Sequence, residues 1–230
     1  MIYAVDIGST IPRGGKTAFA WCKVEDDGRC PQCGTSPDAL VASVHNDIES
    51  GRSVALGIEA PMFIPVPSDS KALSRGRDGE ANRSWAAPAG GYVATLALHQ
   101  TAWILSQLRS RCAEVCTVAV DAASWNHRGA DGPILFLWEA FVSGAAHRGH
   151  AEDAATAAMS FQDRQADLRS DVRAETPISL LGAAVLWSGW GTDLMWLKQE
   201  VIVVRPSEPW EGSLVIAQQS APDDAANLRG

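Results

Sequence analysis

The sequence predicts an α/β protein of three layers, in which a mixed central sheet is flanked by helices. Short apolar runs alternate with longer segments that have helical periodicity. The first two apolar runs follow each other directly, which favours an antiparallel pair, whereas the later runs are reached through helices, which favours parallel pairing. With 230 residues and 46% hydrophobic residues, the chain can bury one substantial core.

The expected elements are bounded by turn and capping residues. Each strand is a short apolar or β-rich run, and the expected strands cover residues 2–6, 17–24, 54–58, 115–121, 133–141 and 201–204. Each helix has apolar residues three or four apart, and two of them begin at a Ser-Pro or Thr-Pro pair. The expected helices cover residues 36–51, 92–111, 151–166 and 176–190.

We expect a single domain over residues 1–205. It has insertions at about residues 25–36 and 61–91, because both segments are polar or irregular and lack a helical or strand period. Residues 206–230 form an expected C-terminal tail that is partly flexible, since its last part is polar without any period.

Composition and charge exclude several classes of function. Acidic residues outnumber basic ones by 27 to 19, and the formal net charge is −8, so a general nucleic-acid coat or a polybasic membrane anchor is not expected. No apolar stretch is long enough to span a bilayer, and the first residues do not resemble a signal peptide. We therefore expect a soluble, cytoplasmic protein with no membrane partner.

The five cysteines have two interpretations. An odd number of cysteines argues against a disulfide framework. Cys22, Cys30 and Cys33 can supply three ligands to a structural zinc ion, although a fourth ligand is not evident. Cys112 and Cys116 lie four residues apart near the end of an expected helix, which indicates core positions.

Acidic residues stand where several of the expected strands end. Asp6 ends the first strand, Glu59 follows the strand over 54–58, and Glu139 lies near the end of the strand over 133–141. Asp153 begins a helix, and His150 lies three residues before it on the same helical face. Ligands of open α/β sheets bind at the carboxyl edge of the strands, so we expect these side chains to gather there.

A gathered set of carboxylates predicts a divalent cation. Such groups repel one another and stay ionised only if positive charge lies between them, and Mg²⁺ or Mn²⁺ prefers carboxylate oxygens and water. Two such ions about 4 Å apart can hold the attacking water and the leaving oxygen of a phosphodiester. Asp6 is the natural bridging ligand, because it lies on the expected central strand. The expected metal ligands are Asp6, Glu59, Glu139 and Asp153, and His150 is expected as a ligand or proton carrier.

Each of these residues also has a purely structural interpretation. A single acid after a strand or at the start of a helix often serves as a cap or a dipole partner, which applies to Asp6 and Asp153. Glu139 has apolar neighbours on both sides, and a buried salt bridge would suit it as well as a metal. His150 alone is more often a cap or a surface residue. The four acids together are more specific than any one of them.

Four short motifs occur in a fixed order within residues 1–205. They are Val5-Asp6-Ile7-Gly8-Ser9-Thr10, Gly57-Ile58-Glu59-Ala60-Pro61, Trp138-Glu139-Ala140-Phe141-Val142-Ser143-Gly144 and His150-Ala151-Glu152-Asp153-Ala154. This order resembles the ribonuclease-H-like predicted nucleases, a family of largely uncharacterised function. In the wider superfamily, metal-dependent phosphodiester hydrolysis uses an acid on the first strand, another on the fourth strand and acids on a late helix.

Holliday-junction resolvases of the RuvC type look especially similar to this pattern. They place Glu on the later strand and an acid or histidine three residues before the helix Asp, which Glu59, His150 and Asp153 match. The resemblance implies that Glu139 is an additional acid of the predicted-nuclease branch. The sequence departs from the family in two respects. The third strand of the usual three-stranded meander is not evident, and a loop over 25–34 stands in its place. An added loop over 61–91 is unusually long, and both departures leave the substrate open.

The long irregular segment over 61–91 is a candidate substrate contact. Between Lys71 and Arg83 it carries four bases against two acids. Arg75, Arg77 and Arg83 are expected to hold phosphates of a nucleic acid or nucleotide, and Trp85 is expected to stack on a base or sugar. Trp85 also fits the simpler role of a hydrophobic plug that fastens the loop.

Two other classes of function remain open. Residues 5–10 also resemble the first phosphate motif of sugar kinases and actin-like ATPases, although the chain is short for that two-domain fold and residues 120–124 lack the glycines of a second phosphate turn. The third class is a non-catalytic interaction domain that keeps the fold without the chemistry. We expect a metal-dependent nuclease or hydrolase, with the nucleotide-binding phosphotransferase and the interaction domain as alternatives.

Overall fold

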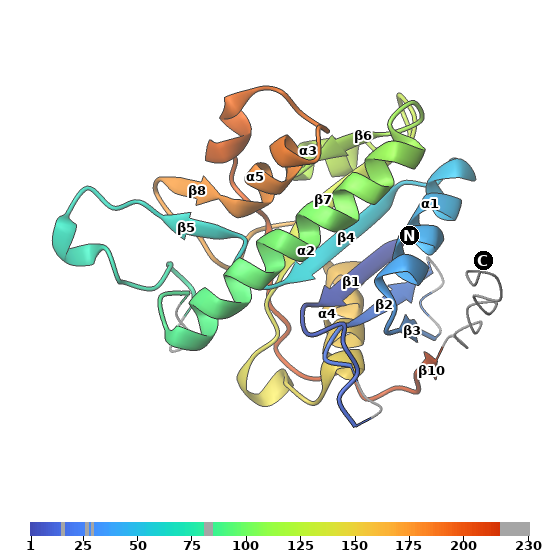
Figure 1. The fold of residues 1–230 in the computed structure, drawn as a ribbon, viewed down its shortest axis with the longest axis horizontal. Coiled ribbons are helices and arrows are strands. Elements are labelled where there is room, and N and C mark those ends of the chain that lie inside the picture. The colour runs from blue at the N-terminus through green and yellow to red at the C-terminus, as the bar shows by residue number, and fades with distance from the viewer. Residues whose placement is uncertain (15–16, 26–27, 29, 81–84, 217–230) are drawn as a thin grey trace, which may run out of the picture.

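The computed structural model describes residues 1–14, 17–25, 28, 30–80 and 85–216. A mixed central sheet organises the chain, with the strand order β10-β3-β2-β1-β4-β7-β6 and with β9 paired to β7 (Figure 1). Its strands are β1 (Ile2–Asp6), β2 (Ala20–Val24), β3 (Gln32–Gly34), β4 (Val54–Glu59), β6 (Thr117–Ala119), β7 (Ile134–Ala140), β9 (Val203–Val204) and β10 (Val215–Ile216).

The strand directions agree with the directions predicted from the sequence. The three strands β1, β2 and β3 pair antiparallel in succession, whereas β1, β4, β7 and β6 pair parallel. A short second sheet pairs β5 (Phe63–Pro65) with β8 (Pro177–Ser179). The predicted α/β class with a mixed sheet flanked by helices is confirmed.

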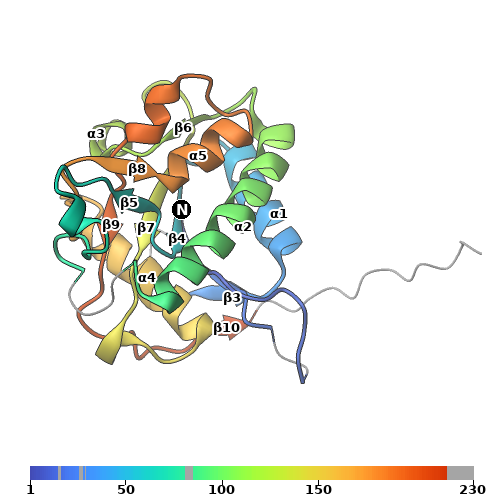
Figure 2. The same ribbon diagram turned by 60° about the vertical axis from the view of Figure 1, so that its left-hand side comes forward.

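Helices cover both faces of the central sheet (Figures 1 and 2). One face carries α1 (Pro37–Glu49), α2 (Pro88–Cys112) and α5 (Leu180–Trp187), and the other carries α4 (His150–Arg164). The remaining short helices are α3 (Ala122–Asn126), η1 (Ser70–Ala72), η2 (Gly144–Ala146) and η3 (Leu194–Lys198).

Alternation along the strands divides the core into two clusters. Tyr3 and Val5 of β1 pack with α1 and α2, whereas Ile2 and Ala4 pack in the cluster that includes Phe161 of α4. This follows from the period of two along a strand, in which successive side chains point to opposite faces. The same alternation decides which acids can meet at the end of the sheet.

Helix α1 begins where the sequence predicts. The Ser36 hydroxyl accepts a hydrogen bond from the Ala39 backbone N–H at 3.3 Å, and Pro37 occupies the first turn. Helix α5 begins later than predicted, because residues 177–179 form β8. Its cap is Ser179, whose hydroxyl accepts from the Gly182 N–H at 2.9 Å.

A third meander strand, β3, lies inside the segment predicted as a loop. It is only three residues long, so it is too short to show an alternating pattern in the sequence. It pairs with β2, and Cys33 lies opposite Cys22 in that pair. The two cysteines form a disulfide, which the odd cysteine count had argued against. The third strand of the antiparallel meander, which was not evident in the sequence, is thus present.

Loss of this disulfide should destabilise the protein measurably. The bridge closes a loop with a sequence separation of 11 residues. For a loop of this size, removal through the double change Cys22→Ser and Cys33→Ser is expected to cost about 3 kcal/mol of unfolding free energy, measured by urea denaturation. The change Cys30→Ser, at an exposed free cysteine, is the control and should leave stability unchanged. Equal stability of the double variant and the control would contradict the expectation.

The expected tail is partly ordered. Residues 215–216 form β10, which extends the sheet by pairing with β3. Residues 217–230, where flexibility was expected, lie outside the described residues. No helix within the described ranges combines the length and apolar character needed to cross a bilayer.

Candidate metal centre

Three carboxylates from distant parts of the chain meet at one end of the sheet. Asp6, Glu59 and Asp153 each offer an oxygen, and these three oxygens lie within 4.8 Å of one another. Asp6 and Glu59 are partners in the parallel pairing of β1 with β4, so both stand at the carboxyl ends of their strands on the same face. Helix α4 packs against that face and brings Asp153 to them.

The first turn of α4 fixes the position of Asp153. Its backbone N–H donates to the Gly149 carbonyl at 2.7 Å. Its carboxylate accepts from the Arg148 backbone N–H at 2.8 Å and contacts His147 Nδ1 at 2.5 Å. Asp153 is 1% exposed, so the carboxylate is held in place by these contacts rather than by solvent.

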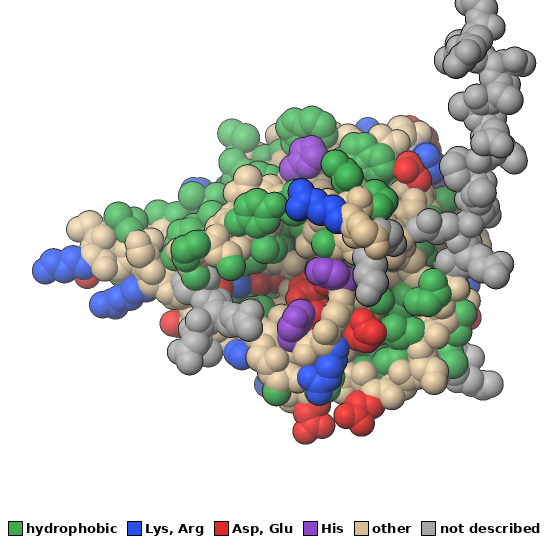
Figure 3. Space-filling model, turned by 60° about the horizontal axis from the view of Figure 1, so that its bottom comes forward, with side chains coloured by type: hydrophobic (Ala, Val, Ile, Leu, Met, Phe, Trp, Pro, Cys, Tyr) green, Lys and Arg blue, Asp and Glu red, His purple; other side chains and the backbone are tan. Residues whose placement is uncertain are grey.

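Two histidines flank the carboxylates. His150 Nδ1 lies 2.7 Å from Asp6 Oδ2, and His147 contacts Asp153. Both side chains are about half exposed, at 49% for His150 and 57% for His147. Figure 3 shows histidine side chains beside acidic side chains in a hollow of this face. His150 was predicted from the sequence, whereas His147 was missed because it precedes the helix in a segment without a period.

Burial disfavours the ionised form of these carboxylates unless a positive charge lies among them. Burial raises the pKa of Asp6 to about 6, with the charge of Asp153 raising it further and the hydrogen bond from His150 opposing both. Burial, followed by the charges of Asp6 and Asp153, raises the pKa of Glu59 well above its usual range. Glu59 Oε2 is buried without a hydrogen-bond partner in the part of the chain that the structure describes.

Glu139 does not join this cluster, although the sequence placed it among the metal ligands. In the pairing of β4 with β7 it stands opposite Ile58, while Ala140 stands opposite Glu59. Glu139 therefore points to the other face of the sheet. There it is fully buried, and its oxygens accept from Arg77 at 2.7 and 2.8 Å and from the Met62 N–H at 2.8 Å. The structure has the salt bridge that was the alternative interpretation of Glu139.

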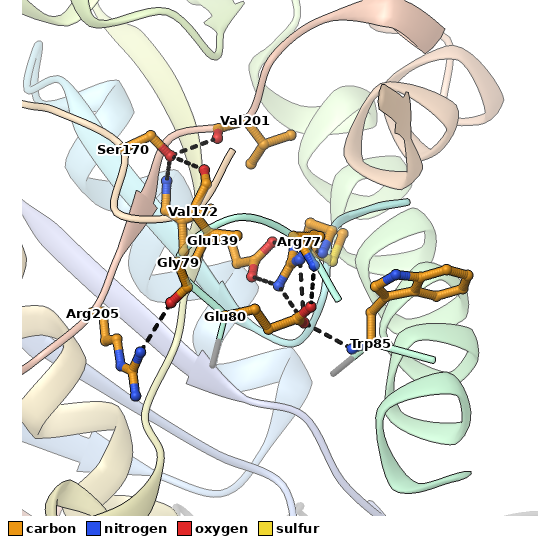
Figure 4. A network of polar contacts seen from close by, with 11 residues as sticks. Arg77, Gly79, Glu80, Trp85, Glu139, Ser170, Val172, Val201 and Arg205 are labelled. Carbon is orange, nitrogen blue, oxygen red and sulfur yellow. Dashed lines mark hydrogen bonds and ion pairs between the residues drawn. The ribbon is translucent and has the colours of Figure 1, made fainter. Parts of the chain in front are cut away.

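Arg77 belongs to this buried network and not to a phosphate-binding surface (Figure 4). Its guanidinium contacts both Glu139 and Glu80, at 2.7 and 3.1 Å, and all three side chains are fully buried. The predicted contact between Arg77 and a phosphate is therefore not supported by the geometry. Arg75 is exposed, and Arg83 lies outside the described residues.

Trp85 fastens the long loop over 61–91. Its backbone N–H donates to Glu80 at 2.8 Å (Figure 4). Its indole Nε1 donates to the Arg75 carbonyl at 3.0 Å. These bonds tie the Trp85 position to the buried Arg77 network. The contacts match the plug interpretation of Trp85 more closely than a free stacking surface.

The cysteines do not form the predicted three-ligand zinc site. Cys22 and Cys33 are bonded to each other, and Cys30 is free and exposed. Cys112 and Cys116 are buried, as expected. A disulfide offers no thiolate to a metal, so the three predicted zinc ligands do not act together.

Fold and site together define an α/β protein with a buried carboxylate cluster at the carboxyl edge of a mixed sheet. No family model matches the chain. No curated protein and no solved structure matches it either.

The pH dependence of stability should differ with and without a divalent ion. The pKa of Asp6 is raised from 3.8 to about 6, so the folded protein binds this proton more tightly than the unfolded chain does. Without metal, the contribution of Asp6 to stability should be fully present below about pH 4 and should be lost as the pH rises from about 4 to about 6. A divalent ion needs the ionised form, so the increase in melting temperature caused by Mn²⁺ should shrink as the pH falls through about 6.

Thermal unfolding over a pH series, with Mn²⁺ and with EDTA, measures both trends. The variant Asp6→Asn should flatten the metal-free dependence in this range, because it removes the titrating group. A stabilisation by Mn²⁺ that stays constant between about pH 5 and about pH 7.5 would contradict this account of Asp6.

Proposed function

We propose that this protein is a divalent-metal-dependent phosphodiesterase that hydrolyses nucleic acid. The observation that carries the proposal is the convergence of Asp6, Glu59 and Asp153, with oxygens within 4.8 Å of one another. Mg²⁺ and Mn²⁺ suit this donor set, because they are hard ions that prefer carboxylate oxygens. The orphaned Glu59 oxygen adds support, because a buried acceptor without a donor is satisfied by a cation.

Each residue has a distinct role in the proposed reaction. A bound divalent ion polarises the phosphoryl oxygen and lowers the pKa of water. Asp6, Glu59 and Asp153 together would hold the ion, each through a carboxylate oxygen. His150 orients the Asp6 carboxylate through its 2.7 Å contact and, being half exposed, is suited to exchanging a proton with the leaving group or solvent.

A ribonuclease-H-like fold is the finer proposal for this chain. It is supported by a three-stranded antiparallel meander, a helix, and a fourth strand that returns parallel to the first. A second support is the placement of the site residues. Acids lie on the first strand, the fourth strand and a late helix, and a histidine lies three residues before the helix Asp. This arrangement resembles that of Holliday-junction resolvases. Glu139 is not part of this proposal, because its carboxylate is committed to Arg77.

An exposed arm carries two basic side chains that can contact phosphates. The segment from β5 through η1 extends away from the sheet (Figure 1), and basic side chains lie at its end (Figure 3). Lys71 and Arg75 are exposed on this segment, and so are Asp69 and Asp78, so its exposed charges balance. A phosphate contact here would depend on the two individual bases and not on a net positive charge.

A hydrolysis assay tests the proposal directly. Single-stranded, duplex and branched DNA and RNA are incubated with the protein in Mn²⁺, in Mg²⁺ and in EDTA. We expect cleavage of at least one substrate with metal and none with EDTA. Thermal stabilisation by ATP without any cleavage would contradict the proposal and favour the phosphotransferase alternative, and stabilisation by neither metal nor ATP would favour the interaction domain.

A further inference from the structure

An arginine stands beside the carboxylate cluster, in the loop between η2 and α4. The Arg148 backbone N–H donates to Asp153 Oδ1 at 2.8 Å. The Arg148 Cα is therefore at most about 4.3 Å from an oxygen of a proposed metal ligand. Within the described ranges, no other arginine or lysine donates a hydrogen bond to Asp6, Glu59 or Asp153.

Two backbone carbonyls of the same loop hold the Arg148 guanidinium. Its Nη1 donates to the Ala145 carbonyl at 2.9 Å and to the His147 carbonyl at 3.0 Å. The loop is itself anchored, because Ala146 is buried in the part of the core that includes Phe161 of α4. A guanidinium held along one edge loses less conformational entropy when it binds a ligand.

The charge of Arg148 is not neutralised by a carboxylate in the part of the chain that the structure describes. The side chain is exposed, and its hydrogen bonds there go through Nη1 alone, which leaves Nε and Nη2 available. Arg77 differs in this respect, because two buried carboxylates already pair with it. A guanidinium has five N–H donors in a planar fork that matches the oxygens of a phosphate.

A phosphate that approaches the cluster meets three carboxylates, and a cation beside them lowers the repulsion. His147 and His150 both direct Nδ1 to an acid of the cluster. Arg148 adds a guanidinium, which stays charged at any pH at which the protein is folded. Figure 3 shows a basic side chain next to the histidines and acids of this face. The hollow therefore combines a proposed metal centre with a fixed positive charge at its side.

We propose that Arg148 binds a phosphate of the substrate strand next to the phosphate held at the metal centre. This inference rests on the proposed function and adds a residue that contacts the strand beside the bond to be cleaved. A contact with phosphate positions the strand without reading its bases, so Arg148 acts on strands of any sequence.

Oligonucleotide binding in EDTA tests this proposal without the metal centre. Fluorescence anisotropy of a labelled oligothymidylate is measured over a series of salt concentrations. Arg148→Met should weaken binding about tenfold at low salt and should lower the slope of log affinity against log salt concentration by about 0.7, as for one lost phosphate contact. An unchanged affinity and slope in folded Arg148→Met, or no binding by the wild-type protein, would overturn the proposal.

Arg111→Met is the matched control for this measurement. Arg111 is exposed near the end of α2 that precedes β6, and β6 and β7 begin together at the opposite end of the sheet from the cluster. The control should therefore keep the wild-type affinity and salt slope. An equal loss in Arg111→Met and Arg148→Met would show a general effect of net charge and would overturn the proposal.

Two further measurements separate a phosphate contact from a structural role of Arg148 in its loop. Arg148→Lys keeps the charge and should keep the wild-type salt slope. Arg148→Met should keep the wild-type Mn²⁺ affinity, because the backbone N–H that holds Asp153 remains. A slope lost in both variants, or a reduced Mn²⁺ affinity, would overturn the proposal. Binding that depends on Arg148 without cleavage in Mn²⁺ or Mg²⁺ would reject the proposed hydrolysis alone, whereas cleavage by Arg148→Met with the wild-type KM would reject the phosphate contact alone.

Discussion

Asp6→Asn should abolish metal-dependent hydrolysis while leaving the fold intact. Asp6 is one of the three carboxylates whose oxygens lie within 4.8 Å of one another, and loss of its charge removes one of the three proposed metal ligands. A bound metal contributes several kcal/mol to stabilisation of the transition state, so the rate should fall by roughly 1,000-fold or more. The melting temperature without metal should be unchanged or higher, because one member of a buried, mutually repelling set becomes neutral.

Asp131→Asn is the matched control for this result. Asp131 is exposed and lies outside the cluster, so the same chemical change should leave both hydrolysis and Mn²⁺ affinity unaltered. Calorimetric titration with Mn²⁺ accompanies the kinetic assay. Asp6→Asn with wild-type cleavage, or with wild-type Mn²⁺ affinity, would contradict the role given to Asp6.

Arg77→Met should destabilise the protein strongly. Arg77 is the cation between the buried carboxylates of Glu80 and Glu139, and its removal leaves both without their ionic partner. Breaking a buried pair in this way costs about 3 to 5 kcal/mol, because an uncompensated charge stays in the core. Urea denaturation measures the change in the free energy of unfolding.

Two further variants separate the buried network from ordinary ion pairs and from the metal centre. Arg169→Met breaks an exposed pair with Asp167 and should cost less than about 1 kcal/mol. Glu139→Gln should leave Mn²⁺ affinity unchanged, because Glu139 faces away from the cluster. A loss of stability in Arg77→Met no larger than in Arg169→Met would show that the network is not fully desolvated. A large loss of Mn²⁺ affinity in Glu139→Gln would return Glu139 to the ligand set.

Three of the four acids predicted as metal ligands lie together in the cluster. Asp6 and Glu59 were predicted to meet because parallel strands share a carboxyl edge, and the structure brings them together in register. Asp153 and His150 also join them from the first turn of α4. These placements depend on strand ends and helix periodicity, which a sequence expresses directly.

The positions of Glu139, β3 and Arg77 were not predictable from the sequence. They depend on single-residue strand register and on contacts between distant parts of the chain. Glu139 lies one position before the register that would point it to the cluster, and strand ends are not predictable to that accuracy. β3 is three residues long, which is too short to recognise, and its disulfide depends on the pairing with β2. Arg77 looked like part of a basic loop because nothing local reveals that the loop returns to the core.

The central claim is that Asp6, Glu59 and Asp153 hold a divalent cation. Crystals grown or soaked in Mn²⁺, with anomalous scattering recorded, test it most directly. We predict an anomalous peak bonded to oxygens of all three carboxylates at about 2.0 to 2.2 Å, which is lost in crystals of Asp6→Asn. An Mn²⁺-soaked crystal with no anomalous peak among these three side chains would contradict the account.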